Sequence, residues 1–161
     1  MNLRVGLGYD IHRLVAGRPM RIACLELPSD RGPLGHSDGD VAAHAAADAL
    51  LSAGGLGDIG LHFPPGDPRW AGASGEQILA ETRRLLDQRG ARPVQIDLTV
   101  VTEEPKIAPH RAAMSRAVAG ALGISPEQVG VKGRSHEGIG EIGRGEAIAA
   151  YAVVLVELTG P

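Results

Sequence analysis

Of all the segments of this chain, Ala147–Leu158 most strongly restricts the possible folds. Its sequence, AIAAYAVVLVEL, is apolar at nearly every position, so an extended strand there would have two apolar faces. The segment is too short to cross a membrane as a helix, which takes about 20 apolar residues. The pattern therefore predicts a central strand of a sheet, with both of its faces needing cover.

Other segments supply the rest of such a sheet. Alternating apolar residues predict further strands over residues 3–7, 20–27, 94–100 and 129–131. Amphipathic spacing and glycine stops predict helices over Val41–Ala53, 76–88 and 109–122. This order predicts an α+β, or mixed α/β, fold: a single domain over residues 1–161, with a mixed sheet and helices packed on one face.

Charge and composition exclude several functions. The chain has 161 residues and a net charge of −3, which argues against a strongly basic nucleic-acid surface. Its 2% of aromatic residues argues against a platform for stacking bases. The single cysteine, Cys24, forms no internal disulfide, and residues 1–6 lack the features of a signal peptide. We expect a cytoplasmic protein with no nucleic-acid or membrane partner.

Three side chains suggest a metal site. Asp10 and His12 are two positions apart at the end of a predicted strand, so they project from one face. His44 lies in the next predicted helix. One carboxylate and two imidazoles suit Zn²⁺ with a fourth position open to water or substrate. The spacing alone leaves open the simpler alternative of a surface aspartate and a core histidine.

The loop before that helix, HSDGD at 36–40, is also polar. Asp40 and His44 are four positions apart and share a helix face, so the carboxylate could orient the imidazole on a metal. The alternative is that one of Ser37, Asp38 and Asp40 only caps the helix.

Seven blocks of sequence, in order over nearly the whole chain, resemble the 2-C-methyl-D-erythritol 2,4-cyclodiphosphate synthase family. They are GYDIH at 8–12, GHSDGD at 35–40 with His44, DALL at 48–51, LGDIG at 56–60, FP and DP within 63–68, PK and PH within 105–110, and GRGE at 143–146. The resemblance implies an intramolecular phosphoryl transfer in non-mevalonate isoprenoid synthesis. The substrate would be 4-diphosphocytidyl-2-C-methyl-D-erythritol 2-phosphate, and the products the 2,4-cyclodiphosphate and CMP.

The resemblance also implies the roles of individual residues. Asp10, His12 and His44 would hold one Zn²⁺ per chain, with other divalent metals compatible, and Glu137 would hold Mg²⁺ or Mn²⁺ bridging the substrate diphosphate. His36 and Ser135 would be catalytic. The residues expected to bind substrate are Asp10, His12, His36, Ser37, Asp58, Ile59, Gly60, Phe63, Asp67, Thr102, Lys106, Ile107, Ala108, Arg134, Ser135, Glu137 and Arg144.

The family further implies a three-fold ring, a homotrimer with active sites between subunits. Arg144 could then bind an isoprenoid diphosphate in a central cavity, or else pair with Glu146 in solvent. Three positions depart from the family pattern: Ser135 replaces a threonine but keeps its hydroxyl, Arg134 replaces a small threonine, and Pro65 replaces an aspartate. Arg134 could contact a phosphate or remain a solvated surface residue.

Two other classes compete with a cyclase. A structural zinc site would want four protein ligands, usually several cysteines, and this chain has one. A metal phosphohydrolase would also use turns rich in His and Asp. Lys106 in a proline-flanked segment and the late GRGE block favour the cyclase.

Overall fold

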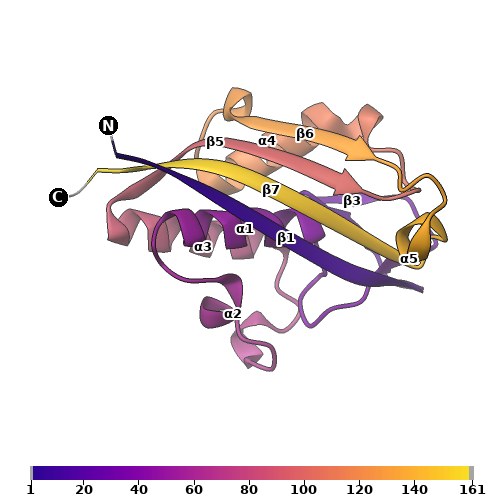
Figure 1. Ribbon diagram of the computed structural model, residues 1–161. Coiled ribbons are helices and arrows are strands. Elements are labelled where there is room, and N and C mark those ends of the chain that lie inside the picture. The colour runs from indigo at the N-terminus through magenta and orange to yellow at the C-terminus, as the bar shows by residue number, and fades with distance from the viewer. Residues whose placement is uncertain (1, 160–161) are drawn as a thin grey trace.

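The apolar segment near the C-terminal end forms the middle strand of a five-stranded sheet in the computed structural model, which describes residues 2–159. The strands, in spatial order, are β4 (Arg31–Pro33), β1 (Asn2–Ala16), β7 (Ala147–Leu158), β5 (Ala91–Val101) and β6 (Val129–Arg134) (Figure 1). β7 runs antiparallel to both β1 and β5, whereas β5 and β6 are parallel. The predicted mixed sheet, with this segment at its centre, is confirmed.

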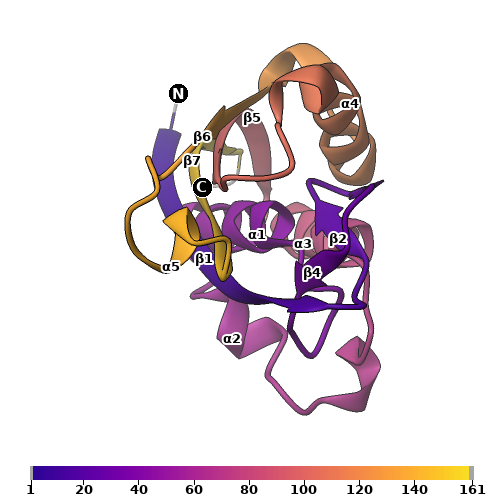
Figure 2. The same cartoon turned by 90° about the vertical axis from the view of Figure 1, so that its right-hand side faces the viewer.

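The longer helices cover one face of this sheet. They are α1 (Val41–Ala53), α3 (Gly75–Arg89) and α4 (Arg111–Leu122). Figure 2 shows all three on the same side of the sheet, where α1 packs on β1 and β7, and α4 packs on β6. The shorter helical segments are α2 (Ile59–His62), α5 (Gly140–Gly143) and 3₁₀ turns at Pro68–Trp70, Ala108–His110 and Pro126–Gln128. The single α+β domain with helices on one face is therefore confirmed, and Met1, Gly160 and Pro161 lie outside the described residues.

Two glycines let α1 lie unusually close to β1. A Cβ atom added to Gly8 would lie 2.0 Å from the carbonyl oxygen of Ala45, and one added to Gly6 would lie 2.0 Å from that of Ala49. Both neighbouring atoms belong to the backbone of α1, so no side chain could rotate away. Glycine in a strand interior often marks such a close approach of another backbone. This contact sets the distance between α1 and the strand that carries Asp10 and His12.

Two strand predictions need correction. Residues 20–27 form a hairpin of β2 (Met20–Ile22) and β3 (Leu25–Leu27), not one strand, because Ala23 and Cys24 turn the chain with φ of 50° and 66°. This turn lacks the Asn or Gly that usually announces it. The strand predicted over residues 3–7 continues to Ala16, because it pairs with β7 as far as Arg13 and with β4 over residues 14–16.

Among residues 2–159, the face of the sheet opposite the helices is covered at one end, where Ile142 of α5 packs with Val101, Ala147 and Ala149. The rest of this face is open, and its apolar side chains, between 46% and 72% exposed, are Val5, Leu7, Tyr9, Ile11, Tyr151 and Val153. We call these six residues the open sheet face. Among residues 2–159, every helix is too short or too polar to span a membrane.

Candidate metal and substrate site

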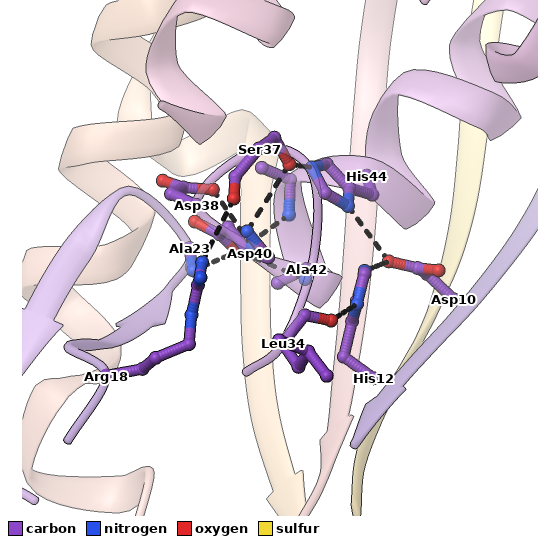
Figure 3. Close-up of polar contacts among 12 residues, drawn as sticks. Asp10, His12, Arg18, Ala23, Leu34, Ser37, Asp38, Asp40, Ala42 and His44 are labelled. Carbon is purple, nitrogen blue, oxygen red and sulfur yellow. Dashed lines mark hydrogen bonds and ion pairs between the residues drawn. The ribbon is translucent and has the colours of Figure 1, made fainter. Parts of the chain in front are cut away.

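Asp10, His12 and His44 converge on one point between β1 and α1. Asp10 and His12 lie on the side of β1 that faces the helices, and His44 lies in the first turn of α1. The Oδ2 atom of Asp10 is 3.0 Å from Nε2 of His12 and 3.0 Å from Nδ1 of His44 (Figure 3). Within residues 2–159, this is the one group of His, Cys, Asp or Glu side chains placed to hold a metal ion.

Hydrogen bonds on the far side of each ring fit this group to a metal. Nδ1 of His12 lies 2.6 Å from the carbonyl oxygen of Leu34, which can only accept, so Nδ1 carries the proton. In the neutral ring Nε2 then carries the lone pair that a metal ion between it and Asp10 would accept, whereas a hydrogen bond from Nε2 to the Asp10 carboxylate requires the doubly protonated ring. His44 has Ser37 Oγ 3.0 Å from its Nε2. A ligating histidine usually has its other ring nitrogen held in this way.

The electrostatics of the cluster also favour a cation. Burial pushes the pKa of Asp10 upward, but hydrogen bonds with His12 and His44 outweigh it and hold that pKa below its usual range. Burial lowers the pKa of His12, whereas its hydrogen bond to Asp10 and the charge of that carboxylate raise it more. The carboxylate therefore stays ionised in a half-buried place, where a divalent ion is strongly attracted.

Asp40 is the helix cap, which settles the alternatives for the loop. Its buried carboxylate accepts hydrogen bonds from the N–H groups of Ala42 and Ala43, at 3.1 and 3.0 Å. It also accepts from Ala23 and Cys24, at 2.8 and 2.6 Å, and so fixes the turn between β2 and β3. The predicted contact between Asp40 and His44 is wrong, because Asp40 is fully engaged with backbone N–H groups; Ser37 contacts that imidazole.

The same loop is fastened to the segment before α3. Nε2 of His36 lies 3.1 Å from the carbonyl oxygen of Asp67. The Asp67 carboxylate accepts hydrogen bonds from Arg69 instead of turning toward the metal group. Asp38 donates its N–H to the carbonyl of Ala73, at 3.0 Å. These bonds hold His36 beside the metal group.

A first cavity, of about 290 Å³, opens beside these residues. It is lined by Tyr9, Asp10, His12, His36, Ser37, His44, Ile59, Gly60, Phe63, Pro65, Trp70 and Ile78. Eight of the twelve were predicted to bind substrate or metal. Tyr9 and Trp70 were not predicted to bind substrate; an aromatic ring in an otherwise polar loop was the signal for Trp70, which packs edge-on to Phe63 with ring centres 4.7 Å apart. Asp58 does not line the cavity, because its carboxylate caps α2.

A second cavity, of about 320 Å³, lies where β5 and β6 end and α4 begins. Its lining residues are Thr102, Pro105, Lys106, Ile107, Ala108, Arg111, Lys132, Gly133, Arg134 and Ser135. It shares no lining residue with the first cavity. The structure therefore divides the predicted substrate residues between two separate places. The sequence reasoning missed Arg111, which directly follows the quoted PK and PH block.

Besides Asp58 and Asp67, the predicted residues Glu137 and Arg144 also line neither cavity. Glu137 is exposed and accepts a hydrogen bond of 2.9 Å from Ser135 Oγ. Arg144 is exposed and pairs with Glu146, with Nε 2.9 Å from Oε1. The ion pair left open for Arg144 is thus present in the structure.

Known proteins share both the sequence and the fold. A model of the YgbB family matches residues 3–157. The 2-C-methyl-D-erythritol 2,4-cyclodiphosphate synthase of Symbiobacterium thermophilum is 53% identical, covering 94% of this chain and 97% of that protein. The synthase of the same name from Dechloromonas aromatica is 52% identical, covering 99% of this chain and 100% of that protein.

A solved structure of 2C-methyl-D-erythritol-2,4-cyclodiphosphate synthase in a form bound to CDP has a TM-score of 0.86 and 44% identity to the chain. The match covers 96% of this chain and 100% of that structure.

Proposed function

The chain belongs to the YgbB family, whose members include the 2-C-methyl-D-erythritol 2,4-cyclodiphosphate synthases just described. We propose that its two kinds of cavity bind opposite ends of a cytidine diphosphate substrate, the first cavity the methylerythritol end and the second the cytidine end. The chain carries out the cyclisation step of non-mevalonate isoprenoid synthesis, and the resemblance seen in the sequence is confirmed. The 2-phosphate of the substrate attacks the β-phosphorus of the cytidine diphosphate arm. The bond from that phosphorus to the oxygen shared with the α-phosphate breaks, and CMP leaves with that oxygen.

The convergence of Asp10, His12 and His44 beside the first cavity is the observation that supports this most directly. In our proposal these three residues hold one Zn²⁺ per chain, although other divalent metals also suit the donor set. The bound metal would supply a Lewis acid that neutralises phosphate charge at its open position. Ser37 and the Leu34 carbonyl would keep both imidazoles oriented for it.

The remaining residues of the first cavity would position the methylerythritol part. His36 would donate to phosphate oxygens that gain charge in the transition state, with Ser37 adding a further contact. Ile59 and Gly60, with Asp58 at the start of α2, would meet the hydroxyl groups of the ribose or methylerythritol. Asp67 acts in our proposal through its carbonyl, which holds His36, and Phe63 supplies an apolar wall.

The second cavity would bind the cytidine. Thr102, Lys106, Ile107 and Ala108 line it. In our proposal they would contact the cytosine mainly through backbone groups of the segment that follows β5. Ser135 would donate its hydroxyl to the phosphates.

Glu137 would hold Mg²⁺ or Mn²⁺. Mg²⁺ is commonly bound by one or two carboxylates together with substrate phosphates, so a single carboxylate suffices there. The bound ion would neutralise charge on the diphosphate. Glu137 lies next to the second cavity through its hydrogen bond with Ser135.

Replacing His36 by alanine should lower kcat by about 100-fold with little change in KM, because its contact strengthens only in the transition state. Ser135→Ala should show the same division between kcat and KM. Steady-state kinetics of both variants measure it. A variant whose KM alone changes would contradict the catalytic role and leave only ordinary binding.

The assembly follows from the two separated cavities and the open sheet face. An exposed apolar patch of this kind is typical of a protein–protein contact. We propose a homotrimeric ring in which the open sheet faces meet around a shared axis. The first cavity of one subunit and the second cavity of its neighbour would then together form one active site. An isoprenoid diphosphate in the central cavity would have to draw Arg144 away from Glu146.

A mixed refolding experiment tests the shared site. If each site uses His44 from one chain and Lys106 from its neighbour, inactive His44→Ala and Lys106→Ala chains should restore one another. Refolded together in equal amounts, they should recover about a quarter of the wild-type activity, since random cyclic assembly leaves about one interface in four intact. Activity that stays at the parental level, or a monomeric mass in solution, would contradict the assembly.

The activity itself is tested by incubating the purified chain with the diphosphocytidyl substrate. We expect CMP and the cyclic diphosphate in equal amounts. Inorganic phosphate would indicate a phosphohydrolase instead, and bound metal without turnover a structural zinc protein. The cytoplasmic location and the absence of nucleic-acid and membrane partners stay predictions.

A further inference from the structure

The second cavity is strongly cationic, and its four cationic side chains differ in whether a carboxylate pairs with them. Its lining includes Lys106, Arg111, Lys132 and Arg134, and no acidic residue. Lys106 pairs with Glu104 at 3.1 Å, and Lys132 pairs with Asp97 at 2.5 Å.

Arg111 and Arg134 differ from those two lysines. Neither has a carboxylate oxygen within 4.0 Å in the part of the chain that the structure describes. Their recorded hydrogen bonds are long ones to nearby carbonyls: Arg111 Nε to Ala108 at 3.4 Å, and Arg134 Nη1 to Gly133 at 3.3 Å. Each guanidinium carries five N–H donors, so most of these donors have no partner among residues 2–159.

The topology brings these two arginines to one place. β5 and β6 are parallel, and Arg134 pairs with Val101 at the last position of their register. The connection between the two strands includes α4, which begins at Arg111. Ligands of α/β sheets bind in the crevice at the carboxyl ends of such strands. The first turn of α4 contains no acidic residue, so the partial positive charge of the helix adds to that of the side chains.

We propose that Arg111 and Arg134 together bind the phosphate nearest the cytidine, which makes Arg111 a substrate-binding residue of this enzyme. The inference rests on the proposed function. Of the two alternatives left open for Arg134, it favours contact with a phosphate over a solvated surface position. A guanidinium presents a planar fork that matches two phosphate oxygens, unlike the point charge of a lysine. The pair would hold the α-phosphate while the bond to the β-phosphorus breaks, and would retain CMP until release.

Isothermal titration of the assembled full-length enzyme with CDP and with cytidine separates a phosphate contact from a base contact. We expect Arg111→Met and Arg134→Met each to raise the Kd for CDP by about 10-fold, the usual scale for removing a hydrogen bond to a charged group. The Kd for cytidine should not change. Arg111→Lys should fall between wild type and Arg111→Met, because it keeps the charge but loses the fork. Arg116→Met is the matched control, since it removes the same charge from the exposed side of α4 outside the cavity.

Three results would overturn the inference. An equal loss of affinity for CDP and cytidine would mean that the arginines shape the base pocket. Unchanged affinity for CDP in both methionine variants would mean that they are solvated. A wild-type chain that binds neither probe would remove the nucleotide site itself. A wild type that fails to cyclise substrate, but still shows the phosphate-specific loss, would refute the proposed function and leave the arginine site standing.

Discussion

Replacing His44 by alanine should remove the bound metal ion and lower kcat/KM by well over about 100-fold. Mutating a residue that merely orients a metal ligand typically costs about 10- to 100-fold, and loss of the ligand itself should cost more. Asp10 and His12 would remain as two ligands, which leaves the tetrahedral site half built. Elemental analysis of dialysed protein gives the metal content per chain, and the cyclisation assay gives the rate.

The fold of that variant should stay intact, because alanine is the best helix former and α1 is already rich in it. Its far-ultraviolet circular dichroism should match that of the wild type. His110→Ala serves as the matched control, since the His110 side chain has no recorded hydrogen bond and lies outside the metal group. A His44→Ala chain that keeps one metal ion per site would show that the metal is held elsewhere.

Gly8→Ala should destabilise the whole domain and disturb the metal site together. The new Cβ would lie 2.0 Å from the Ala45 carbonyl oxygen and 2.9 Å from the Ala49 nitrogen, both on the backbone of α1. Overpacking a core usually costs about 1–3 kcal/mol, and a clash between two backbones should reach about 3 kcal/mol or more. That loss would lower the unfolding midpoint by about 6–12 °C. Because α1 carries His44 and β1 carries Asp10, separating the two elements should also weaken metal binding.

A second glycine substitution separates this contact from a general effect of alanine. Gly120 lies on the exposed side of α4, and a Cβ added there would meet no atom within 4 Å. Gly120→Ala should therefore stabilise the protein by about 0.5–1 kcal/mol, through the better helix propensity of alanine. Thermal unfolding of both variants, with and without added zinc, measures the two effects. A Gly8→Ala chain as stable as the wild type, with unchanged metal affinity, would mean that α1 does not depend on this close approach.

Local patterns predicted much of the architecture, because they depend on residues that are near one another in the chain. The helix at Val41–Ala53 was predicted with the bounds that the structure shows. The central place of β7 followed from its two apolar faces. Local spacing suggested the residues of the metal group, since residues two apart on a strand share a face, and the family resemblance then singled them out. The sequence could not tell whether His44 reaches that face.

Where the predictions were incomplete, the deciding contact came from a distant part of the chain. The hairpin over residues 20–27 turns at Ala23 and Cys24, which carry no turn signal of their own. The Asp40 carboxylate, from beyond β4, accepts both of their N–H groups. In the sequence, Arg111 is an ordinary residue at the start of a helix. Only the structure shows that it lines the same cavity as Arg134 of β6.

The sequence by itself determined the elements, their order, the central strand and the residue types of the metal group, because periodicity and capping act over a few residues. Only the tertiary structure decided that the donor atoms of Asp10, His12 and His44 converge on one point, and that Arg111 and Arg134 share a cavity. Those relations depend on distances between elements, such as the close approach of α1 to β1 that Gly6 and Gly8 permit. That spacing brings His44 to 3.0 Å from Asp10. A glycine in a strand is compatible with many packings, and only the backbone that lies against it selects one.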